Sequence, residues 1–576
     1  WLNYRNWIGS HKQCTTSHST HSVETGCKTR QQGRFRNQTN TTFTTSIDNL
    51  TTLGSEIMIP KNRLQTFNQD APPGECVVYW MISARRSKWN HGLQHAIELA
   101  NQRQMPLVVV EALAIAHQWA NDRSHTFVIQ GMMDNRNAFE DTPVTYVPYV
   151  ETKPYEARGL LEKWMEYADV LVIDDFPVYM PRRIREIAVE IGKCEIHSVD
   201  SNGFISLEQE KPFTTAYSLR RHLHKTILQH MSEFPEASPL DKAKHLPKFS
   251  AEKVEKIFAE SDTPVTPYEF IWRICEIDDI GLAALSVLSI DHSVPPVQHT
   301  KGGSIAAYSA WREFFRERLS DYSENRNQPE LNGSSGLSPY LHFGHISPHQ
   351  ILSEIFQKHN WDISRIIPPD NGRRSGWWDL PEYVEAFLDQ IIVWRDLGFI
   401  HCSKVKNHHE FASIPEWAQK TLKEHEDDPR PFIYTFEEFE NAETHDELWN
   451  AAQRQLRTDG MIHNYLRMLW GKKILEWTPT PEIAMEYMVA LNDKWALDGR
   501  DPNTYTGIGW VLGKFDRGWT ERPVYGKIRC MTTDSTKRKY RTKKYIETYS
   551  NSPSSQQSLF KNAKVNSTSV RYERRK

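Results

Sequence analysis

Short apolar runs of strand length alternate with helical segments in the first half of the chain. CVVYWMI at Cys76–Ile82 and PLVVVEAL at Pro106–Leu113 flank a stretch with helical spacing, and ADVLVIDDF at Ala168–Phe176 follows two further helical stretches and the strand-like TYVPYV. Strands that alternate with helices form a parallel sheet covered on both faces. We therefore expect a Rossmann-like α/β domain over residues 71–235.

The pattern changes after Gly302. Long amphipathic stretches follow one another there, and the strand signal fades. A connector with helices, residues 236–300, lies before this region. Helical periodicity sustained over such a length predicts a largely α-helical second domain over residues 301–548, a size that supports one core. The expected fold class is thus an α/β domain followed by an all-α domain.

Both ends of the chain are polar and lack periodicity. The first 57 residues are rich in Thr, Ser, Asn and Gln, and Met58 would make a more natural start than Trp1. We expect residues 1–70 to be disordered or non-native, and residues 549–576 to be a disordered tail. A transit peptide is the alternative for the leading segment, although its acidic residues and weak amphipathicity count against that interpretation.

Composition and missing motifs exclude several classes of protein. The seven cysteines form no CxxC or CxxH pair, which disfavours a zinc site, an iron–sulfur cluster and a disulfide framework, so we expect no metal site and a reducing compartment. No apolar run of about 18 residues is present. The net charge of -3 argues against a protein that binds polyanions over its whole surface, but the segment Glu521–Thr548 is locally basic. That segment fits either a solvated surface or contact with phosphates.

Three tryptophans carry the most informative spacing. MIHNYLRMLWGKKILEW at Met461–Trp477 has the pattern of a helix and places Trp470 and Trp477 seven residues apart. At about 100° per residue both indoles lie on one face, about 10.5 Å apart along the axis. Trp449 lies one segment upstream. Aligned tryptophans are typical of core packing, but they also serve as stepping stones for a single electron, and spacing alone leaves both open.

Two polar turns next to aromatic residues suggest ligand contacts. GSSGLSPYLHFGHIS at Gly333–Ser347 leads from a small-residue turn into a helix, and its N–H groups and hydroxyls could hold a phosphate or simply cap the helix. LNDKWALDGRDPNTYTGIGW at Leu491–Trp510 is dense in Asn, Asp and Arg, which suits a ligand wall or ordinary turn formation. Within it, Asp498 is a good partner for Arg467, should that guanidinium be buried.

Five motifs, taken in order, resemble the class II cyclobutane pyrimidine dimer photolyases of the photolyase/cryptochrome family. They are SGLSPYLHFGHIS, FLDQIIVWRDLGF, MIHNYLRMLWGKKILEW, LNDKWALDGRDPN and ERPVYGKIR, and the similarity runs from Val77 to about Ile546. The resemblance implies an α/β domain and a helical domain that buries FAD. The implied activity is that of a deoxyribodipyrimidine photo-lyase, which repairs pyrimidine dimers in DNA by electron transfer from excited, reduced FAD to the flipped-out dimer.

The resemblance also assigns residues to the flavin. Those that would hold its ribityl chain and phosphates are Tyr322, Ser334, Ser335, Gly336, Leu337 and Ser338. Arg467 and Asp498 would form an ion pair beside the isoalloxazine, Asn492 would lie near N5, and Asn503 would be a further contact. The indoles that match the family's electron relay are Trp470, nearest the flavin, then Trp449, and Trp477, nearest solvent.

At the lesion, the resemblance assigns contacts to Arg326, Asn327, Trp394, Met468 and Trp510. Trp394 and Trp510 would embrace the flipped dimer, Met468 would line its floor, and the other two would contact it or order water. Gln390 occupies a position where the family usually has Glu. Its amide keeps the capacity for hydrogen bonds but supplies no carboxylate.

Other interpretations stay open at this stage. A cryptochrome-like blue-light sensor would use the same FAD and Trp relay, although the short tail and both lesion-embracing indoles favour repair. A non-enzymatic scaffold would use the tryptophans for packing alone. The sheet could accept a deazaflavin or pterin antenna, for which no residue set is evident. The expected partner is double-stranded DNA that contains pyrimidine dimers, bound by a monomer without a membrane, in the cytoplasm of a prokaryote or the nucleus of a eukaryote.

Overall fold

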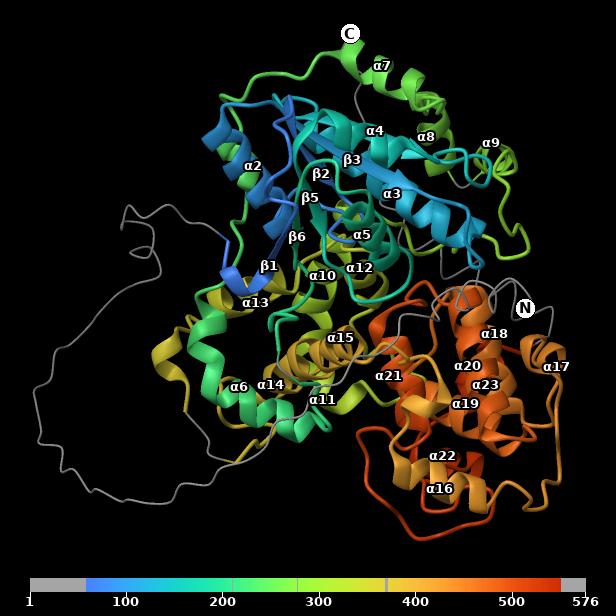
Figure 1. Cartoon of the computed structure of the whole chain (residues 1–576). Coiled ribbons are helices and arrows are strands. Elements are labelled where there is room, and N and C mark those ends of the chain that lie inside the picture. The colour runs from blue at the N-terminus through green and yellow to red at the C-terminus, as the bar shows by residue number, and fades with distance from the viewer. Residues whose placement is uncertain (1–58, 210, 277, 368–370, 551–576) are drawn as a thin grey trace, which may run out of the picture. The chain divides into compact units, whose positions relative to one another are not determined.

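The structure, a computed structural model, describes residues 59–209, 211–276, 278–367 and 371–550. Within these residues, an α/β domain precedes a helical domain (Figure 1). The disorder expected for residues 1–58 and 551–576 lies outside the described residues. Tyr549, which we expected in the disordered tail, is ordered, and its hydroxyl donates a 2.5 Å hydrogen bond to Asp459.

The described part of the α/β domain contains one six-stranded sheet in the order β1-β6-β5-β2-β3-β4. The strands are β1 Leu64–Phe67, β2 Cys76–Trp80, β3 Leu107–Leu113, β4 Thr145–Val150, β5 Ala168–Asp174 and β6 Glu195–Val199. The strands from β2 to β6 pair in parallel, and β1 joins β6 in the antiparallel direction. Every residue of β5 is buried, as expected for a strand with helices on both faces. The predicted Rossmann-like sheet is confirmed.

Residues 59–70 are ordered, so the expectation of disorder up to residue 70 is wrong. They form the short 3₁₀ turn η2 Lys61–Arg63 and the edge strand β1. The Arg63 guanidinium is buried and donates hydrogen bonds to the main-chain carbonyls of Gly203 and Phe204, at 3.1 and 2.8 Å. LQTF is too short and too polar to show a strand pattern, and its order comes from β6 and from these long-range contacts.

Helices cover both faces of the sheet. They are α2 His91–Arg103, α3 Asp122–Phe139, α4 Leu160–Tyr167 and α5 Tyr179–Ile191, and α6 Ala216–Met231 follows. Successive strand residues point to opposite faces, so Val78 packs in the layer of α4 and α5, and Val77 packs in the layer of α2 and α3. The side chains of Asn90 and Asn121 cap α2 and α3 by accepting hydrogen bonds from main-chain amides.

The connector and the helical domain follow, and the predicted all-α second domain is confirmed. The connector elements are η3 Pro239–Lys242, α7 Ala251–Glu260, α8 Tyr268–Cys275 and α9 Asp279–Leu285. Those of the first part of the helical domain are α10 Ser304–Glu313, η4 Phe314–Arg318, η5 Leu319–Asp321, α11 Tyr322–Asn325, α12 Ser338–His342, α13 Pro348–Lys358, η6 Ile363–Arg365, α14 Glu382–Leu388, η7 Asp389–Trp394 and α15 Arg395–Lys404. Those of the second part are η8 Phe411–Ser413, α16 Glu416–Glu424, α17 Phe436–Glu440, α18 Glu447–Asp459, α19 Asn464–Glu476, α20 Pro481–Trp495, α21 Pro502–Val511, α22 Thr533–Lys539 and α23 Lys543–Thr548.

One arginine links the α/β domain to the helical domain. Arg123, in the first turn of α3, has a buried guanidinium. Its Nη1 donates to the carbonyls of Leu456 and Trp495 at 3.2 and 2.5 Å, and its Nη2 donates to that of Arg457 at 2.6 Å. Its Nε donates to Pro295 at 3.1 Å. Since carbonyls in the last turn of a helix lack partners within the helix, Arg123 satisfies α18 and α20 together.

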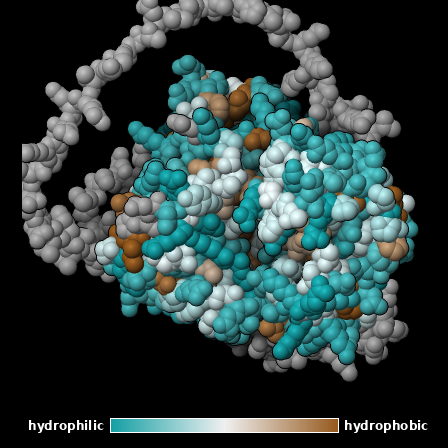
Figure 2. All heavy atoms as spheres, turned by 90° about the horizontal axis from the view of Figure 1, so that it is seen from below, coloured by the Kyte–Doolittle hydropathy of each residue, from teal (hydrophilic) through white to brown (hydrophobic). Residues whose placement is uncertain are grey.

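The helices, the surface and the potential metal ligands give three further findings. Among the described residues, no helix is long and apolar enough to cross a membrane. The face shown in Figure 2 is mainly hydrophilic, with hydrophobic residues in small separate patches. In the same part of the chain, no group of three or more His, Cys, Asp and Glu side chains has the arrangement of a metal site.

Candidate functional site

The three predicted relay indoles come together between α18 and α19. The rings of Trp449 and Trp470 are 6.4 Å apart between centroids, with 4° between their planes. Trp449 also contacts Trp477, with 6.1 Å between centroids and 65° between planes. The spatial order is therefore Trp470, Trp449, Trp477. All three are buried, and Trp477, expected nearest solvent, is itself 1% exposed and contacts the exposed His445.

Local structure fixes this register of α18 against α19. Asp446 caps α18 by accepting hydrogen bonds from two main-chain amides, and Gly460 ends it with φ at +67°, a conformation that favours glycine. The indole nitrogen of Trp449 donates to the main-chain carbonyl of Trp470 at 3.0 Å. The indole nitrogen of Trp470 in turn donates to Oε1 of Gln453 at 2.9 Å. Each of these two indoles is thus held by the helix that carries the other one.

Polar residues expected at the flavin lie beside this relay. Arg467, one turn before Trp470 on α19, places its Nη2 3.1 Å from Oδ1 of Asp498, the pair that the resemblance implies. Asn492 of α20 is buried, and its Nδ2 donates to Oγ1 of Thr504 on α21 at 3.0 Å. The side chain of Asn503 donates instead to the carboxylate of Asp501, with 2.9 Å between the atoms. Helices α19, α20 and α21 thus converge on one polar region.

The expected phosphate turn leads into α12. Gly336 has φ at +69°, and a Cβ there would meet open space, so the turn leaves room beside its backbone. The turn residues, expected in sequence to bind, are Ser334, Ser335, Gly336, Leu337 and Ser338. Arg318 holds the start of this turn, because its Nη1 donates to the carbonyl of Ser334 at 2.5 Å. Leu337 is buried in the hydrophobic core and anchors the other end.

The segment that follows Tyr322 leaves polar atoms of Arg326 and Gln328 without partners among the described residues. Tyr322 is buried at the start of α11, and the Arg326 guanidinium carbon lies 5.5 Å from its ring centroid. Asn327 follows and is half-buried. Among the described residues, Nη1 of Arg326 and Oε1 of Gln328 are buried with no hydrogen-bond partner. Because buried polar atoms in native proteins are nearly always bonded, this region fits a polar ligand.

Two of the residues expected at the lesion lie on a π-helix. Gln390 and Trp394 belong to η7, and π-turns within helices occur frequently at functional sites. Asp389, beside Gln390, is buried and accepts two hydrogen bonds from the guanidinium of Arg220 on α6, at 2.6 and 2.9 Å. Analysis of the sequence missed Arg220 and Asp389. No local signal could have paired them, because they are 169 residues apart in the chain.

Trp394 and Trp510 lie at the same end of a helix pair. The thiol of Cys402, in the last turn of α15, is 3.7 Å from the carbonyl oxygen of Pro502, at the start of α21. One turn earlier on α15, Gly398 lies against Thr506. The two helices therefore run antiparallel, with Trp394 just before the start of α15 and Trp510 near the end of α21. Both indoles are half-buried.

Two cations lie against the Trp510 ring. Lys472 Nζ is 5.5 Å and the Arg529 guanidinium carbon is 5.6 Å from its centroid. The Lys472 ammonium also donates to the carbonyl of Val511 at 2.5 Å. Burial lowers the pKa of Lys472 to about 7. Met468, on the same helix as Lys472, is half-buried against the cluster that contains the relay.

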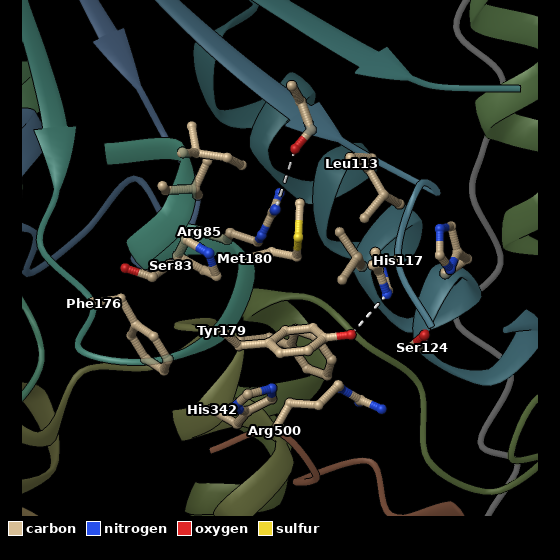
Figure 3. A pocket seen from close by; sticks show the side chains of 18 residues that line it. Ser83, Arg85, Leu113, His117, Ser124, Phe176, Tyr179, Met180, His342 and Arg500 are labelled. Carbon is tan, nitrogen blue, oxygen red and sulfur yellow. Dashed lines mark hydrogen bonds between the residues drawn. The ribbon is translucent and has the colours of Figure 1, made fainter. Parts of the chain in front are cut away.

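A separate cavity lies at the carboxyl ends of β2, β3 and β5, where ligands bind in open parallel sheets (Figure 3). Its lining includes Arg85, His117, Tyr179, His342 and Arg500. Tyr179 and His117 share a hydrogen bond of 3.1 Å across it, and burial holds the pKa of His117 well below its ordinary value. Tyr179 has φ at +57°, which is uncommon outside glycine and is concentrated at functional sites.

One carboxylate shapes the wall of this cavity. Oδ2 of Asp174, at the end of β5, accepts hydrogen bonds from the main-chain amides of Ile82, Ser83 and Ala84 at 2.8–2.9 Å. Its Oδ1 accepts a further one from the hydroxyl of Tyr79 at 2.7 Å. The loop after β2 is therefore fixed at three successive residues.

Solved structures with the same fold come from photolyases and a cryptochrome. The archaeal photolyase of Sulfolobus tokodaii is 13% identical, with a TM-score of 0.56 over 84% of this chain and 93% of that one. The Synechocystis cryptochrome is 14% identical, with a TM-score of 0.56 over 83% and 89% of the two chains. At such identities the likeness concerns the fold alone. No protein-family model matches the chain.

Curated relatives are similar in sequence over most of their length. The deoxyribodipyrimidine photo-lyase of Methanothermobacter thermautotrophicus is 32% identical over 502 residues, which are 85% of this chain and 98% of that protein. The photo-lyase of Oryza sativa is 32% identical over 491 residues, or 82% and 87% of the two chains. That of Arabidopsis thaliana is 31% identical over 498 residues, or 85% and 91%. Similarity at this level over nearly the whole of a relative identifies the chain as a member of the deoxyribodipyrimidine photo-lyase family.

Proposed function

We propose that the protein is a light-driven lyase that splits cyclobutane pyrimidine dimers in DNA and that it binds FAD. The observation that carries this function is the chain of ring contacts through Trp470, Trp449 and Trp477, in a protein that aligns with 98% of a named photo-lyase. The fold alone would also suit a light sensor, since a cryptochrome shares it. The motifs quoted above support placement in class II.

The flavin, when bound, supplies absorption of light and the transferable electron, and the chain supplies binding and electrostatics. The Ser334–Ser338 turn and Tyr322 would hold the phosphates and ribityl chain, and the unpartnered Nη1 of Arg326 gives this region a spare donor. Arg467 with Asp498 and the amide of Asn492 would contact the ring system. The S. tokodaii photolyase contains two FAD molecules, which supports a flavin here.

The lesion would enter between Trp394 and Trp510. A pyrimidine dimer stacks and pairs poorly, so extruding it costs less than the few kcal/mol needed for a normal base. Stacking on two indoles then returns about 1–3 kcal/mol per base. Gln390 offers an amide donor where the family resemblance implies a carboxylate, and the carboxylate of the preceding Asp389 is engaged by Arg220.

Duplex DNA would be held through its phosphates by the basic segment Glu521–Thr548. Its exposed basic residues are Arg522, Lys527, Lys537, Arg538, Lys539, Arg541, Lys543 and Lys544. Within the part of the chain that the structure describes, none of these side chains lies within 4 Å of a carboxylate. Unpaired cations suit phosphate contact, which makes affinity fall steeply with salt.

We also infer that the cavity at the sheet's carboxyl end is the place for an antenna pigment such as a deazaflavin or pterin. Arg85 and Arg500 supply positive charge, and the rings of Phe176 and Tyr179 supply flat apolar walls. Aromatic walls with a few placed polar groups are typical of small-molecule sites.

A repair assay on a defined thymine dimer tests the function. The FAD-loaded protein, reduced beforehand, is expected to remove dimers under blue or near-UV light and to leave them intact in darkness. Trp470→Phe is expected to lose photoreduction of oxidised FAD yet to keep repair when reduced beforehand, because the relay serves only the reduction. Trp164→Phe, which changes a buried indole of the α/β domain, is the matched control and should keep both. Equal dimer counts in lit and dark samples would refute the function.

A further inference from the structure

The indole of Trp470 has one N–H, and a neutral amide accepts it. Oε1 of Gln453 lies 2.9 Å from Nε1 of Trp470, and Gln453 is 0% exposed. The other end of the same amide, Nε2, donates to the main-chain carbonyl of Glu440 at 3.3 Å. An indole N–H can only donate and a carbonyl can only accept, so both neighbours fix the orientation of the amide. The oxygen of Gln453 therefore faces Trp470.

The next indole in the relay has the same kind of acceptor. Nε1 of Trp449 donates to the main-chain oxygen of Trp470 at 3.0 Å. Both contacts are buried, so water does not replace these acceptors. Amide oxygens accept hydrogen bonds but are not bases near neutral pH, whereas an ionised carboxylate is a base that can take a proton from an acidic donor. The inner two indoles consequently have hydrogen-bond acceptors but no base.

We propose that Gln453 is a positioning residue whose amide holds the indole N–H of Trp470 but cannot take its proton, so that the oxidised indole stays protonated and charge moves along the relay without a proton. The proposal rests on the proposed function, because it requires the relay. Removal of one electron from Trp470 by photoexcited flavin leaves an indole radical cation with its N–H intact. One electron from Trp449 then restores neutral Trp470 and leaves the radical cation on Trp449. The proton stays on Nε1 throughout, and only the electron vacancy moves outward.

A carboxylate in place of the Gln453 amide would change where the Nε1 proton of oxidised Trp470 resides. It would take the Nε1 proton of oxidised Trp470 and give a neutral indole radical beside a neutral carboxylic acid. An electron from Trp449 could then restore Trp470 only if the proton returned at the same time. The vacancy would therefore stay at Trp470, where it recombines with the flavin electron. The amide at 453 thus favours outward transfer.

Flash absorption spectroscopy of the FAD-loaded wild-type chain is the first test. The indole radicals are expected to have the spectrum of the protonated radical cation. The rate of transfer from Trp449 to Trp470 should be the same in H₂O and D₂O and constant across neutral pH. A neutral indole radical at Trp470, or a clear solvent isotope effect on that transfer, would overturn the proposal without any variant.

Two variants provide the second test. Gln453→Glu is expected to yield the neutral radical at Trp470, and a photoreduction yield lowered by about tenfold, at every pH where the infrared band of the ionised carboxylate is present. Gln453→Met, which offers no acceptor, is expected to keep the protonated radical cation. A protonated radical beside an ionised carboxylate would contradict the proposal. So would a neutral radical in the Met variant.

The two possible failures are distinguishable. Trp470→Phe provides the spectrum of a chain without the first relay indole. Were the wild type to match that spectrum, no relay would operate, and both the relay of the proposed function and the role of Gln453 would be refuted. Light-induced indole radicals that are already deprotonated at Trp470 would refute only the role of Gln453.

Discussion

Individual side chains show where sequence information ends. Helical spacing predicts Trp470 and Trp477 on one helix; Trp470 lies in α19, Trp477 follows its last residue, and their rings are bridged by Trp449 of α18. That order depends on how α18 packs against α19, which no spacing within a helix encodes. Gln453, which accepts the hydrogen bond from the Trp470 indole, also lies on α18, so spacing within the relay helix could not predict it either. By contrast, Arg467 and Asp498 could be paired from the sequence, because a guanidinium amid apolar neighbours requires a carboxylate.

Lys472 should make stability depend on pH. Its folded pKa of about 7, lowered by burial and by Arg529 but raised by Asp516 and Cys530, lies below the ordinary value near 10.4. Between these values the unfolded chain binds more protons, so the free energy of unfolding rises as pH increases from about 7 to about 10. At about 1.4 kcal/mol per pKa unit, the contribution reaches roughly 4 kcal/mol.

Urea titrations at neutral and alkaline pH measure this contribution. Lys472→Met is expected to remove that part of the rise with pH. Lys420→Met, at a side chain that is 76% exposed, should leave the pH dependence as in the wild type. Parallel curves for the wild type and Lys472→Met would show that the buried amine does not titrate in this window.

Helices and strands could be predicted from the sequence where the pattern of apolar residues determines them. The runs of β2, β3 and β5 were evident, since buried parallel strands are continuously apolar. The relay helix begins at Asn464 rather than Met461, a difference of the kind usual at helix ends. The π-turn of η7 has no sequence signature, because its hydrogen-bond shift results from packing. The antiparallel register of α15 and α21 likewise depends on the contact at Gly398.

Gly398 sets the spacing of that helix pair. A Cβ at this position would lie 2.6 Å from Oδ1 of Asn503 and 2.9 Å from Oγ1 of Thr506. Gly398→Ala should therefore push α15 from α21, lower the free energy of unfolding by about 1–3 kcal/mol, and weaken binding of dimer-containing DNA, because Trp394 and Trp510 depend on this pair. Urea denaturation and a fluorescence binding assay measure both effects.

Gly507 on α21 is the matched control, because a Cβ there meets nothing within 4 Å. Gly507→Ala should leave DNA binding intact and stabilise the protein by up to about 1 kcal/mol through helix propensity. Equal effects of the two substitutions on DNA binding would refute the claim that close packing at Gly398 positions Trp394 and Trp510.

At the scale of the whole molecule, the two-domain architecture could be predicted from the sequence. The contacts that join the two domains could not. Periodicity distinguishes an α/β half from a helical half, and the comparisons agree with both. Arg123, however, contacts Leu456 across 333 residues of sequence. An arginine in the first turn of a helix ordinarily faces solvent, so only the tertiary structure reveals that it satisfies carbonyls of α18 and α20.

Arg123→Met should destabilise the junction between the domains. It leaves the carbonyls of Leu456, Arg457 and Trp495 without this donor, which we expect to cost about 2–4 kcal/mol of unfolding free energy. Urea denaturation followed by separate probes of the two domains measures the loss and shows whether they still unfold together. Arg158→Met, at an exposed position, is the control and should have little effect. A loss below about 0.5 kcal/mol, the range of ordinary surface substitutions, would contradict the role of Arg123.

The loop after β2, which Asp174 holds in place, has a consequence for the exchange of a bound small molecule. Three consecutive amides are satisfied by one carboxylate before any small molecule arrives. A pigment bound in this recess, as proposed above, would meet a wall already in its final shape, so little of its affinity would be lost to ordering the protein. Dissociation and replacement by a chemically different chromophore then require no remodelling of that wall. Under that proposal, one pigment in the α/β domain could be exchanged for another without any change in the helical domain.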